Sequence, residues 1–548
     1  MKNSATSSAA LGRYGLAALA GLLLSAGFAP WEVAGAAWAG PGLMLLCALG
    51  QRGGRAFRLG FVGGFVHFLS SLYWLLAMPF TWLGIPLVPA LAWIALSAYC
   101  ALYTGLWVWF CWKIFPPRES GGPEFSLVAQ VDQFLSVAWL RRAGWAILCA
   151  AAWTALELAR GRVLSGFPWN FLGATQYTLL PLIQIASITG VYGVSFMIVW
   201  FSVAVGGVML ILARRPSTPS IWGQAALPLL TLCWILAYGM TKSWGIPVPS
   251  REIKVALIQP SIPQTLIWDA KENAARFQQV LALSEKALAT KPQLLLWPES
   301  AVPDLGLENE QAIQHLLASR PAWLIFSGDS AEPLPSGKNA DFNSAFLVNP
   351  AGMAEAVYHK RRLVIFGEYV PLLRWLPFLK WLTPISDGFT PGERAVQFNL
   401  TNLSAKTSVL ICFEDMFPQE ARDHVEEDTD FLINLTNDGW FGQGPEQKQQ
   451  AACALFRAVE NGVPLVRCCN NGLTCWIDAQ GRIREIERAG NSIYGPGFIT
   501  PQIPLRELGP RSPTIYNRYG DWFGWSCCAL CGLYLIPTLR RPGVAETT

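Results

Sequence analysis

Charged residues and histidine are scarce in this sequence. Asp, Glu, Lys and Arg make up 14% of its 548 residues, whereas a soluble globular protein carries about a quarter. Only four histidines are present, so Ser-His-Asp chemistry has little support. The polar part of the chain has no H-E-x-x-H and no paired C-x-x-C pattern, so we expect neither a metal nor another cofactor. The net charge of +4 is too small to indicate a nucleic-acid partner.

Cysteine is also too sparse to build a small disulfide-linked scaffold, because 13 cysteines are spread over the whole chain. Apolar residues, in contrast, are abundant. Hydrophobic residues make up 52% of the sequence and aromatic residues 12%, which excludes a disordered chain. Little charge combined with this much apolar sequence indicates membrane spans, and the length leaves room for at least one further domain.

Residues 1–243 consist of long apolar runs separated by short polar breaks. A helix needs about 20 apolar residues to cross a hydrocarbon core about 30 Å thick, and most of the runs approach or exceed that length. Buried helices of a large soluble protein are the alternative, but almost no charges lie inside the runs. We therefore expect a multi-pass bundle of eight transmembrane helices, seven within 1–243 and one within 519–541. The runs are 15–28, 33–49, 59–78, 87–112, 144–158, 183–212, 225–239 and 522–535.

Basic residues between the runs predict the orientation of the bundle. They gather before the first run and in every second loop, whereas the opposite short loops hold only Arg160 and Arg162. The positive-inside rule then places both ends of the chain in the cytoplasm and residues 251–511 on the opposite side. A cleaved signal peptide is the alternative for the first run, but its removal would break this alternation. The cytoplasmic set is Lys2, Arg13, Arg52, Arg55, Arg58, Lys113, Arg118, Arg141, Arg142, Arg214, Arg215, Arg540 and Arg541.

From residue 251 to 511 the chain has the pattern of a soluble domain. Short β-type runs alternate with helical ones such as 271–289 and 446–460. This alternation is typical of an α/β sandwich and not of a helical bundle or an all-β barrel. The expected strands are 253–259, 293–297, 322–328, 344–348, 357–360, 407–412, 431–435, 464–468 and 474–477.

Three reactive side chains stand at the ends of expected strands: Glu299, Lys360 and Cys412. Each has an ordinary explanation when it is taken alone, since a single cysteine is usually a buried small hydrophobe and a single lysine is usually solvated. Together they supply a base, a cation and a nucleophile. A thiol needs a base to become a thiolate, and a nearby ammonium favours both the thiolate and the oxyanion that follows its attack.

The order of these residues resembles the Glu-Lys-Cys triad of the nitrilase, or carbon-nitrogen hydrolase, superfamily. Glu299 lies in Trp-Pro-Glu and Cys412 in Ile-Cys-Phe-Glu. Within that superfamily, the whole chain resembles the bacterial apolipoprotein N-acyltransferases. The supporting motifs are Gly-Phe-Ala-Pro-Trp at 27–31, Gly-Phe-Pro-Trp at 166–169, Gln-Pro-Ser-Ile-Pro-Gln at 259–264, Phe-Gly-Glu-Tyr-Val-Pro at 366–371, Thr-Asn-Asp-Gly-Trp-Phe-Gly at 436–442, Arg-Ala-Val-Glu at 457–460 and Asn-Asn-Gly-Leu-Thr at 470–474.

The resemblance implies an αββα catalytic sandwich and an acyltransferase in the bacterial inner membrane, with its catalytic domain periplasmic. Such an enzyme moves a fatty acyl chain from a phospholipid donor to the N-terminal amine of diacylglyceryl-cysteine on an apolipoprotein. Glu299 would be the base and Cys412 the nucleophile that carries the acyl group as a thioester. Lys360 and a backbone N–H near Phe413 would hold the oxyanion.

The resemblance also suggests supporting residues. Glu368 and Glu414 are candidates for orienting Lys360, and Trp268 and Trp440 are candidates for lining the entrance for the lipid substrates. The chain departs from the family pattern at Phe413, where a tyrosine is frequent, and at 468–469, where two cysteines replace smaller or hydroxylated residues. Neither departure touches the triad, and we interpret both as packing variants.

Two other functions are compatible with parts of the pattern. A membrane-tethered amidase of the nitrilase type would act on a small amide or nitrile, but it would need only one anchoring span. A transporter with a large external domain would carry ionisable residues inside its spans, and here His67 and Glu157 are almost the only ones.

Overall fold

The computed structural model describes residues 2–78, 88–115, 127–214, 218–244, 250–267, 269–303, 305–333, 339–371, 388–490, 492–507, 509 and 511–539. The chain divides into two compact units. The helical unit comprises Met1–Tyr73, Trp93–Trp244 and Tyr519–Thr548, and the sandwich unit comprises Trp74–Ala92 and Gly245–Arg518.

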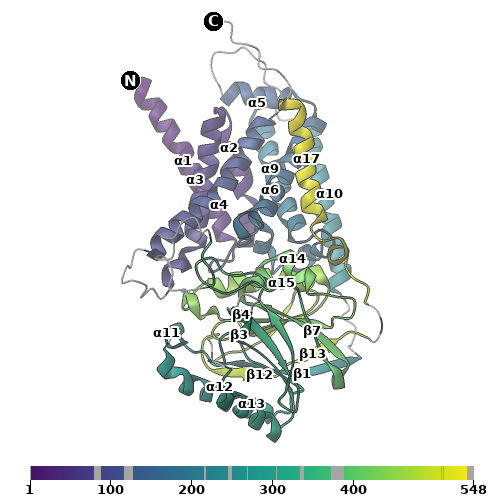
Figure 1. The fold of residues 1–548 in the computed structure, drawn as a ribbon. Helices are drawn as coiled ribbons and strands as arrows, with labels where there is room; N and C mark the ends of the chain where they lie inside the picture. The colour runs from purple at the N-terminus through teal and green to yellow at the C-terminus, as the bar shows by residue number, and fades with distance from the viewer. Residues whose placement is uncertain are drawn as a thin grey trace. The chain divides into compact units, whose positions relative to one another are not determined.

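Every expected apolar run coincides with helical structure (Figure 1). The longer helices are α1 (Lys2–Ala26), α3 (Gly53–Ser71), α4 (Val88–Lys113), α6 (Trp139–Arg160), α9 (Val191–Arg214), α10 (Thr218–Ser243) and α17 (Trp522–Leu539). The shorter ones are α2 (Gly40–Ala48), α5 (Leu127–Ser136), α7 (Leu180–Ile183) and α8 (Ala186–Thr189), with 3₁₀ turns η1 (Ala34–Trp38), η2 (Tyr73–Ala77), η4 (Val163–Ser165) and η5 (Leu172–Gln176).

Among the described residues, three helices are long and apolar enough to cross a membrane: α4, α9 and the Ser220–Ser243 part of α10. A fourth is possible if α5 and α6, which meet at a bend of 115°, count as one span. Two expected spans are interrupted. The run 33–49 is divided between η1 and α2, and the run 183–212 breaks at Gly190, whose φ of 69° ends α8. Helix length and composition therefore support three or four spans among the described residues, and the expected number of eight is not confirmed.

Glycine allows the first and third helices to approach very closely. A Cβ atom added at Gly21 of α1 would lie 2.1 Å from the carbonyl oxygen of Gly63 in α3. Contacts of this kind between small residues are typical of helix packing in membranes, where the apolar side chains gain nothing by leaving lipid.

The sandwich unit contains two sheets. The first has the strand order β12-β1-β2-β3-β4-β5, with β13 also paired to β1, and the second has the order β11-β10-β9-β8-β7-β6. Strands β1, β2 and β3 run parallel to one another, as do β7, β8 and β9. The strands are β1 (Arg251–Gln259), β2 (Leu294–Leu296), β3 (Trp323–Pro333), β4 (Asn339–Val348), β5 (Ala354–His359), β6 (Gln397–Leu400), β7 (Ala405–Ile411), β8 (Phe431–Thr436), β9 (Leu465–Cys469), β10 (Cys475–Ile477), β11 (Ile483–Ile486), β12 (Gly497–Ile499) and β13 (Gln502–Leu505).

Two apolar layers hold this unit together. One lies between the sheets and includes Val255, Leu296, Val409 and Ile433. The other packs the outer face of the first sheet against α12 (Asn273–Leu288) and α13 (Leu307–Ser319). Helices α14 (Pro418–Asp423) and α15 (Glu446–Asn461) pack beside the second sheet. Alternate side chains of the central strands of the first sheet face these two layers, and the expected α/β sandwich is confirmed.

Candidate active site

The three candidate catalytic residues directly follow strands, or lie within three residues of a strand end. Glu299 follows β2, Lys360 follows β5 and Cys412 follows β7. In the first sheet β5 runs in the same direction as β2, because β4 is antiparallel to both β3 and β5, so β2 and β5 end at the same edge. The side chains consequently meet there: Lys360 Nζ lies 3.4 Å from Glu299 Oε1, and the charges of both residues act on the thiol of Cys412.

Lys360 is almost completely buried, with 1% of its side chain exposed, and it is surrounded by carboxylates. Its Nζ lies 2.8 Å from Glu368 Oε1, so the expected contact between these two residues is present. Burial lowers the pKa of Lys360, but the negative charges of Glu368 and Glu299 together raise it above its ordinary value. Lys360 is therefore a permanent cation at neutral pH, as an oxyanion partner must be.

Asn343 on β4, which the sequence analysis did not identify, joins the two carboxylates beside Lys360. Its Nδ2 donates to Glu299 Oε1 at 3.0 Å and to Glu368 Oε1 at 2.9 Å. The second oxygen of Glu299 accepts the backbone N–H of Asn437 at 3.2 Å. Glu299 is thus held at both oxygens, and its orientation toward Lys360 is determined by the surrounding structure.

Glu414 accepts hydrogen bonds from the Tyr358 hydroxyl and from backbone amides beside Lys360 and Cys412. Its oxygens accept the N–H groups of Arg361 at 2.7 Å and Arg362 at 3.0 Å, just after Lys360, and that of Ile411 at 2.8 Å, just before Cys412. It therefore ties together the two turns that carry Lys360 and Cys412. Burial, followed by the charge of Glu420, raises the pKa of Glu414 to about 7.

Cys412 occupies a strained backbone conformation immediately beyond β7. Its φ is 54°, in the left-handed region that non-glycine residues seldom adopt, and its side chain is half-buried. Burial and the charge of Glu299 raise the pKa of the thiol, Lys360 lowers it, and the net result is a pKa well above the ordinary value. The thiol is therefore protonated at neutral pH and would need a base to act as a nucleophile.

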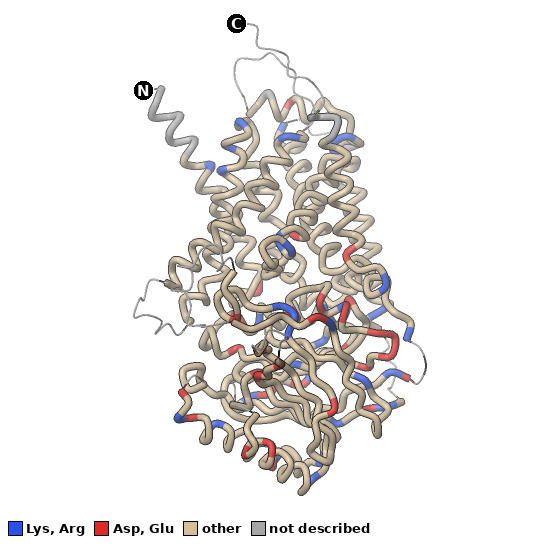
Figure 2. Tube along the Cα trace, viewed as in Figure 1, with Lys and Arg blue, Asp and Glu red and all other residues tan. Residues whose placement is uncertain are grey.

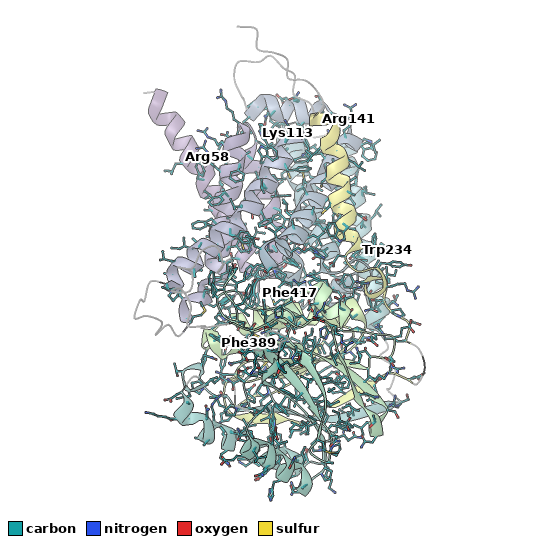
Figure 3. The ribbon with its side chains drawn as sticks, in the orientation of Figure 1. Arg58, Lys113, Arg141, Trp234, Phe389 and Phe417 are labelled. Atoms are coloured by element: carbon teal, nitrogen blue, oxygen red, sulfur yellow. The ribbon has the colours of Figure 1, made fainter. Side chains whose placement is uncertain are left out.

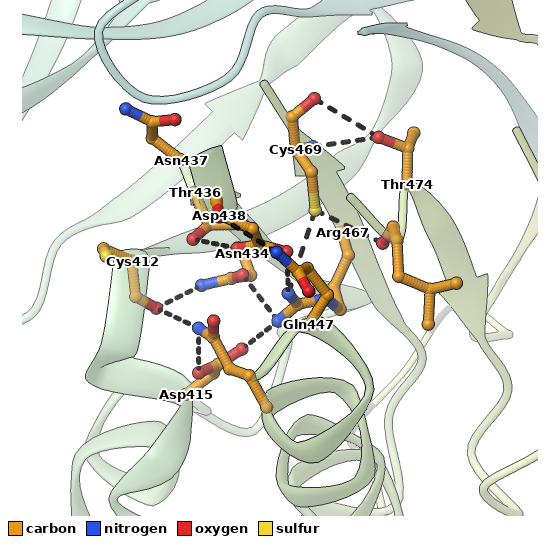
Figure 4. Close-up of polar contacts among 12 residues, drawn as sticks. Cys412, Asp415, Asn434, Thr436, Asn437, Asp438, Gln447, Arg467, Cys469 and Thr474 are labelled. Atoms are coloured by element: carbon orange, nitrogen blue, oxygen red, sulfur yellow. Dashed lines mark hydrogen bonds and ion pairs between the residues drawn. The ribbon is translucent and has the colours of Figure 1, made fainter. Parts of the chain in front are cut away.

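Two side-chain amides hold the carbonyl oxygen of Cys412 (Figure 4). Asn434 Nδ2 donates to it at 2.8 Å and Gln450 Nε2 at 3.2 Å, while the sulfur points away from this network. Behind them, Arg467 pairs with Asp415 and, at 3.3 Å, with Asp438. Neither Asn434 nor Gln450 was predicted from the sequence. A polar residue inside the otherwise apolar run 431–435 was the one available signal, and it pointed to Asn434 only.

Fewer contacts are available for the other three candidates, which are Phe413, Trp440 and Trp268. The ring of Phe413 lies 5.9 Å from Lys360 Nζ and packs edge-on against Phe417, one of the side chains labelled in Figure 3. Trp440 is half-buried in the turn η10 (Asp438–Phe441), which begins one residue after Asn437. Trp268 lies outside the described residues. Within the described part of the chain, no three His, Cys, Asp or Glu side chains are grouped as metal ligands.

The fold and this cluster of Glu, Lys and Cys define a protein of the nitrilase class, and the comparisons with known proteins agree. Residues 254–510 match the family model described as carbon-nitrogen hydrolase, and residues 20–204 match that of the apolipoprotein N-acyltransferase N-terminal domain. The chain belongs to the apolipoprotein N-acyltransferase family.

Relatives in that family align over most of the chain. An apolipoprotein N-acyltransferase of Geobacter metallireducens is 33% identical over 97% of this chain and 96% of its own length. One from Rickettsia prowazekii is 29% identical over 85% of this chain and 86% of its own. Among solved structures, an amidase from Nesterenkonia sp. aligns with 48% of this chain and 94% of its own, at 19% identity and a TM-score of 0.35.

Proposed function

We propose that this protein transfers a fatty acyl chain from a membrane phospholipid to the N-terminal amine of diacylglyceryl-cysteine on apolipoproteins. The observation that carries the proposal is the buried Lys360 between Glu299 and Glu368, whose charges act on the strained Cys412. In a chain of this family, that cluster contains a base, a cation and a nucleophile for acyl transfer.

The first half of the reaction forms a thioester. Glu299 takes the proton of the Cys412 thiol, and the thiolate attacks the ester carbonyl carbon of the phospholipid. Lys360 and the backbone N–H of Phe413 stabilise the oxyanion of the tetrahedral intermediate. The bond to the glycerol oxygen breaks, that oxygen receives the proton from Glu299, and a lysophospholipid leaves.

The second half transfers the acyl group. The amine of the lipoprotein attacks the thioester carbon and loses a proton to Glu299, and the same two groups hold the second oxyanion. The carbon–sulfur bond then breaks, and the sulfur recovers a proton. The raised pKa of Cys412 favours this protonated resting state and makes the base necessary in each cycle.

We also propose the expected membrane placement, with residues 1–243 and 519–541 crossing the inner membrane in eight passes and 251–511 forming a periplasmic catalytic domain. The distribution of basic residues supports it. Arg58, Lys113 and Arg141 come from three different helices and lie at the same end of the helical unit (Figure 3). A shared basic end is what the positive-inside rule requires of the cytoplasmic side.

The decisive test of the activity is the mass of the purified protein after incubation with phospholipid alone. We expect an increase equal to one acyl group, reversible by hydroxylamine and absent from Cys412→Ser. Acyl transfer that proceeds at the wild-type rate without a thioester at Cys412 would refute the mechanism. Release of ammonia from a small amide, with no phospholipid requirement, would favour the amidase alternative.

Placement is tested by labelling in intact spheroplasts. A cysteine introduced for Lys338 should react with a membrane-impermeant maleimide, and one introduced for Gly121 should react only after lysis. Both positions lie outside the described residues, in polar stretches of the sequence. The reverse pattern would put Cys412 in the cytoplasm and contradict the lipoprotein acceptor.

A further inference from the structure

The backbone carbonyl group of Cys412 is fixed by hydrogen bonds from two side chains. Its oxygen accepts two hydrogen bonds, from Asn434 Nδ2 at 2.8 Å and from Gln450 Nε2 at 3.2 Å. Both donors are buried, with exposed fractions of 0% and 2%. The φ of Cys412 is unfavourable for a non-glycine residue, so these two bonds help to stabilise its backbone conformation.

Charged neighbours determine which end of each side-chain amide faces the carbonyl. Arg467 Nη1 donates to Asn434 Oδ1 at 3.0 Å, which leaves the Nδ2 end for Cys412. Gln450 Nε2 donates to Asp415 Oδ1 at 2.9 Å as well as to Cys412, so a flipped amide would set two oxygens against each other. Arg467 and Asp415 are themselves ion-paired and fully buried. The neighbouring charges therefore fix both side-chain amides with their N–H groups toward the carbonyl oxygen.

This carbonyl shares a peptide group with the N–H of Phe413. In a planar trans peptide the C=O and the N–H point in opposite directions, so fixing the oxygen also fixes the direction of the N–H. Hydrogen bonds accepted by the oxygen polarise the peptide and make its N–H a better donor. Asn434 and Gln450 consequently act on the far side of the same peptide.

We propose that Asn434 and Gln450 are positioning residues that aim and polarise the Phe413 N–H as an oxyanion donor. The inference rests on the proposed acyl transfer and adds a residue-level account of how the oxyanion site is built. Neither side chain touches the substrate. Their contribution is made through the Cys412–Phe413 peptide, in both tetrahedral intermediates.

The test compares two reactions of the same thiol. Thioester formation from phospholipid passes through an oxyanion, whereas alkylation by iodoacetamide displaces iodide at a saturated carbon and builds none. Asn434→Leu removes the N–H donor without adding a charge beside Cys412, and Gln450→Met keeps the length of the side chain without a donor. Loss of a direct oxyanion donor costs about 10²–10³-fold in rate, so we expect about 10-fold or more from each of these indirect changes.

We expect the thioester to form at least about 10-fold more slowly in either variant, while the alkylation rate of Cys412 stays within about twofold of the wild type. Transfer from a preformed thioester to the amine should slow by the same factor, because the second intermediate uses the same N–H. Gln449→Met is the matched control: Gln449 is buried on the same helix, and its Oε1 accepts from Trp74 Nε1 at 3.1 Å. Its thioester formation should be unchanged.

Equal losses in acylation and alkylation would overturn the inference, because they would mean that the nucleophile itself had moved. Unchanged acylation in both variants would overturn it as well. Either variant decides the question if the other fails to fold, and the thermal midpoint identifies such a failure. If the wild-type protein forms no thioester, the proposed function fails. If the wild type forms it and the variants do so equally fast, only this inference fails.

Discussion

The helical unit and the sandwich unit bury their polar side chains in opposite ways. In the helical unit the partners are mostly backbone carbonyls: Ser25 Oγ donates to the oxygens of Gly21 and His67, and Arg160 donates to those of Phe167 and Trp169. In the sandwich unit, buried cations meet carboxylates, as Lys360 does with Glu368 and Arg467 with Asp415. Figure 2 shows the contrast, since most of the helical unit is free of charged residues.

This difference follows from the surroundings of each unit. A charge in a membrane-spanning helix is costly, and a carbonyl of the same or a neighbouring helix is an available acceptor that brings no charge of its own. A buried ion pair in a sheet edge contributes little net stability, because desolvation offsets the attraction. The clustered charges of the sandwich unit should therefore serve the chemistry, whereas the close packing of the helical unit should serve stability.

The largest expected effect separates chemistry from stability in the sandwich unit. Cys412→Ala should reduce acyl transfer by about 10⁴-fold or more, as the loss of a nucleophile does in other enzymes, and should leave the thermal midpoint nearly unchanged. The thioester assay and thermal unfolding in detergent measure the two quantities. Cys453→Ala, at a buried cysteine of α15, is the control and should keep its activity. A large loss of stability in Cys412→Ala would break the comparison.

Changing the charges next to the nucleophile should have the next largest effect. Glu299→Gln removes the base and Lys360→Met removes the cation, and we expect thioester formation to fall by about 10³-fold in each. Single-turnover incubation with phospholipid alone isolates this step. Thioester formation at the wild-type rate in either variant would show that the residue has no part in the first half-reaction. The ion pair between them would then be structural.

A smaller effect, on stability alone, is expected in the helical unit. The added methyl group of Gly21→Ala would meet the Gly63 oxygen at 2.1 Å, so α1 and α3 must separate, at a cost of about 1–3 kcal/mol. Gly15→Ala on the same helix is the matched control, because no atom lies within 4 Å of its added Cβ. Thermal midpoints in detergent distinguish the two. An equal response from both variants would show that close packing of these helices is not what stabilises the unit.

Local patterns predicted the parts of the molecule that depend on local sequence. Cys412 and Lys360 were identifiable because each stands at the end of an expected strand, and the structure places each of them directly after a strand. The apolar runs predicted helices because helix formation by such a run also depends on local sequence. The run 183–212 was expected as one span, and the break at Gly190 depends on a single residue with a positive φ inside an apolar sequence.

Residues that act through distant contacts could not be predicted in this way. Asn343 meets Glu299 and Glu368 across 44 and 25 positions of the chain, and Gln450 meets Cys412 across 38. Nothing near either residue in the sequence indicates its partner. Strands β6, β11, β12 and β13 were not predicted; each has only three or four residues, and Pro504 lies within the last. The pairing of β12 and β13 with β1 is determined by tertiary packing.

The smallest expected effect concerns the pH dependence of the thiol, and its sign follows from the charges around Cys412. Burial and Glu299 raise the pKa of the thiol more than Lys360 lowers it, so the thiolate is a minor species at neutral pH. Alkylation by iodoacetamide should then rise about tenfold per pH unit from pH 7 to 9 without levelling, since the thiolate fraction does so below the pKa.

Glu368 is a further group that raises this pKa. Glu368→Gln should therefore lower it and accelerate alkylation a few-fold at pH 7.5, although the same change weakens the hold on Lys360 and slows acylation. The rate of modification of the peptide containing Cys412, followed by mass spectrometry, measures the profile. A plateau below pH 8 would mean that Lys360 dominates the carboxylates, and the charges of the sandwich unit would then activate the thiol directly instead of through Glu299.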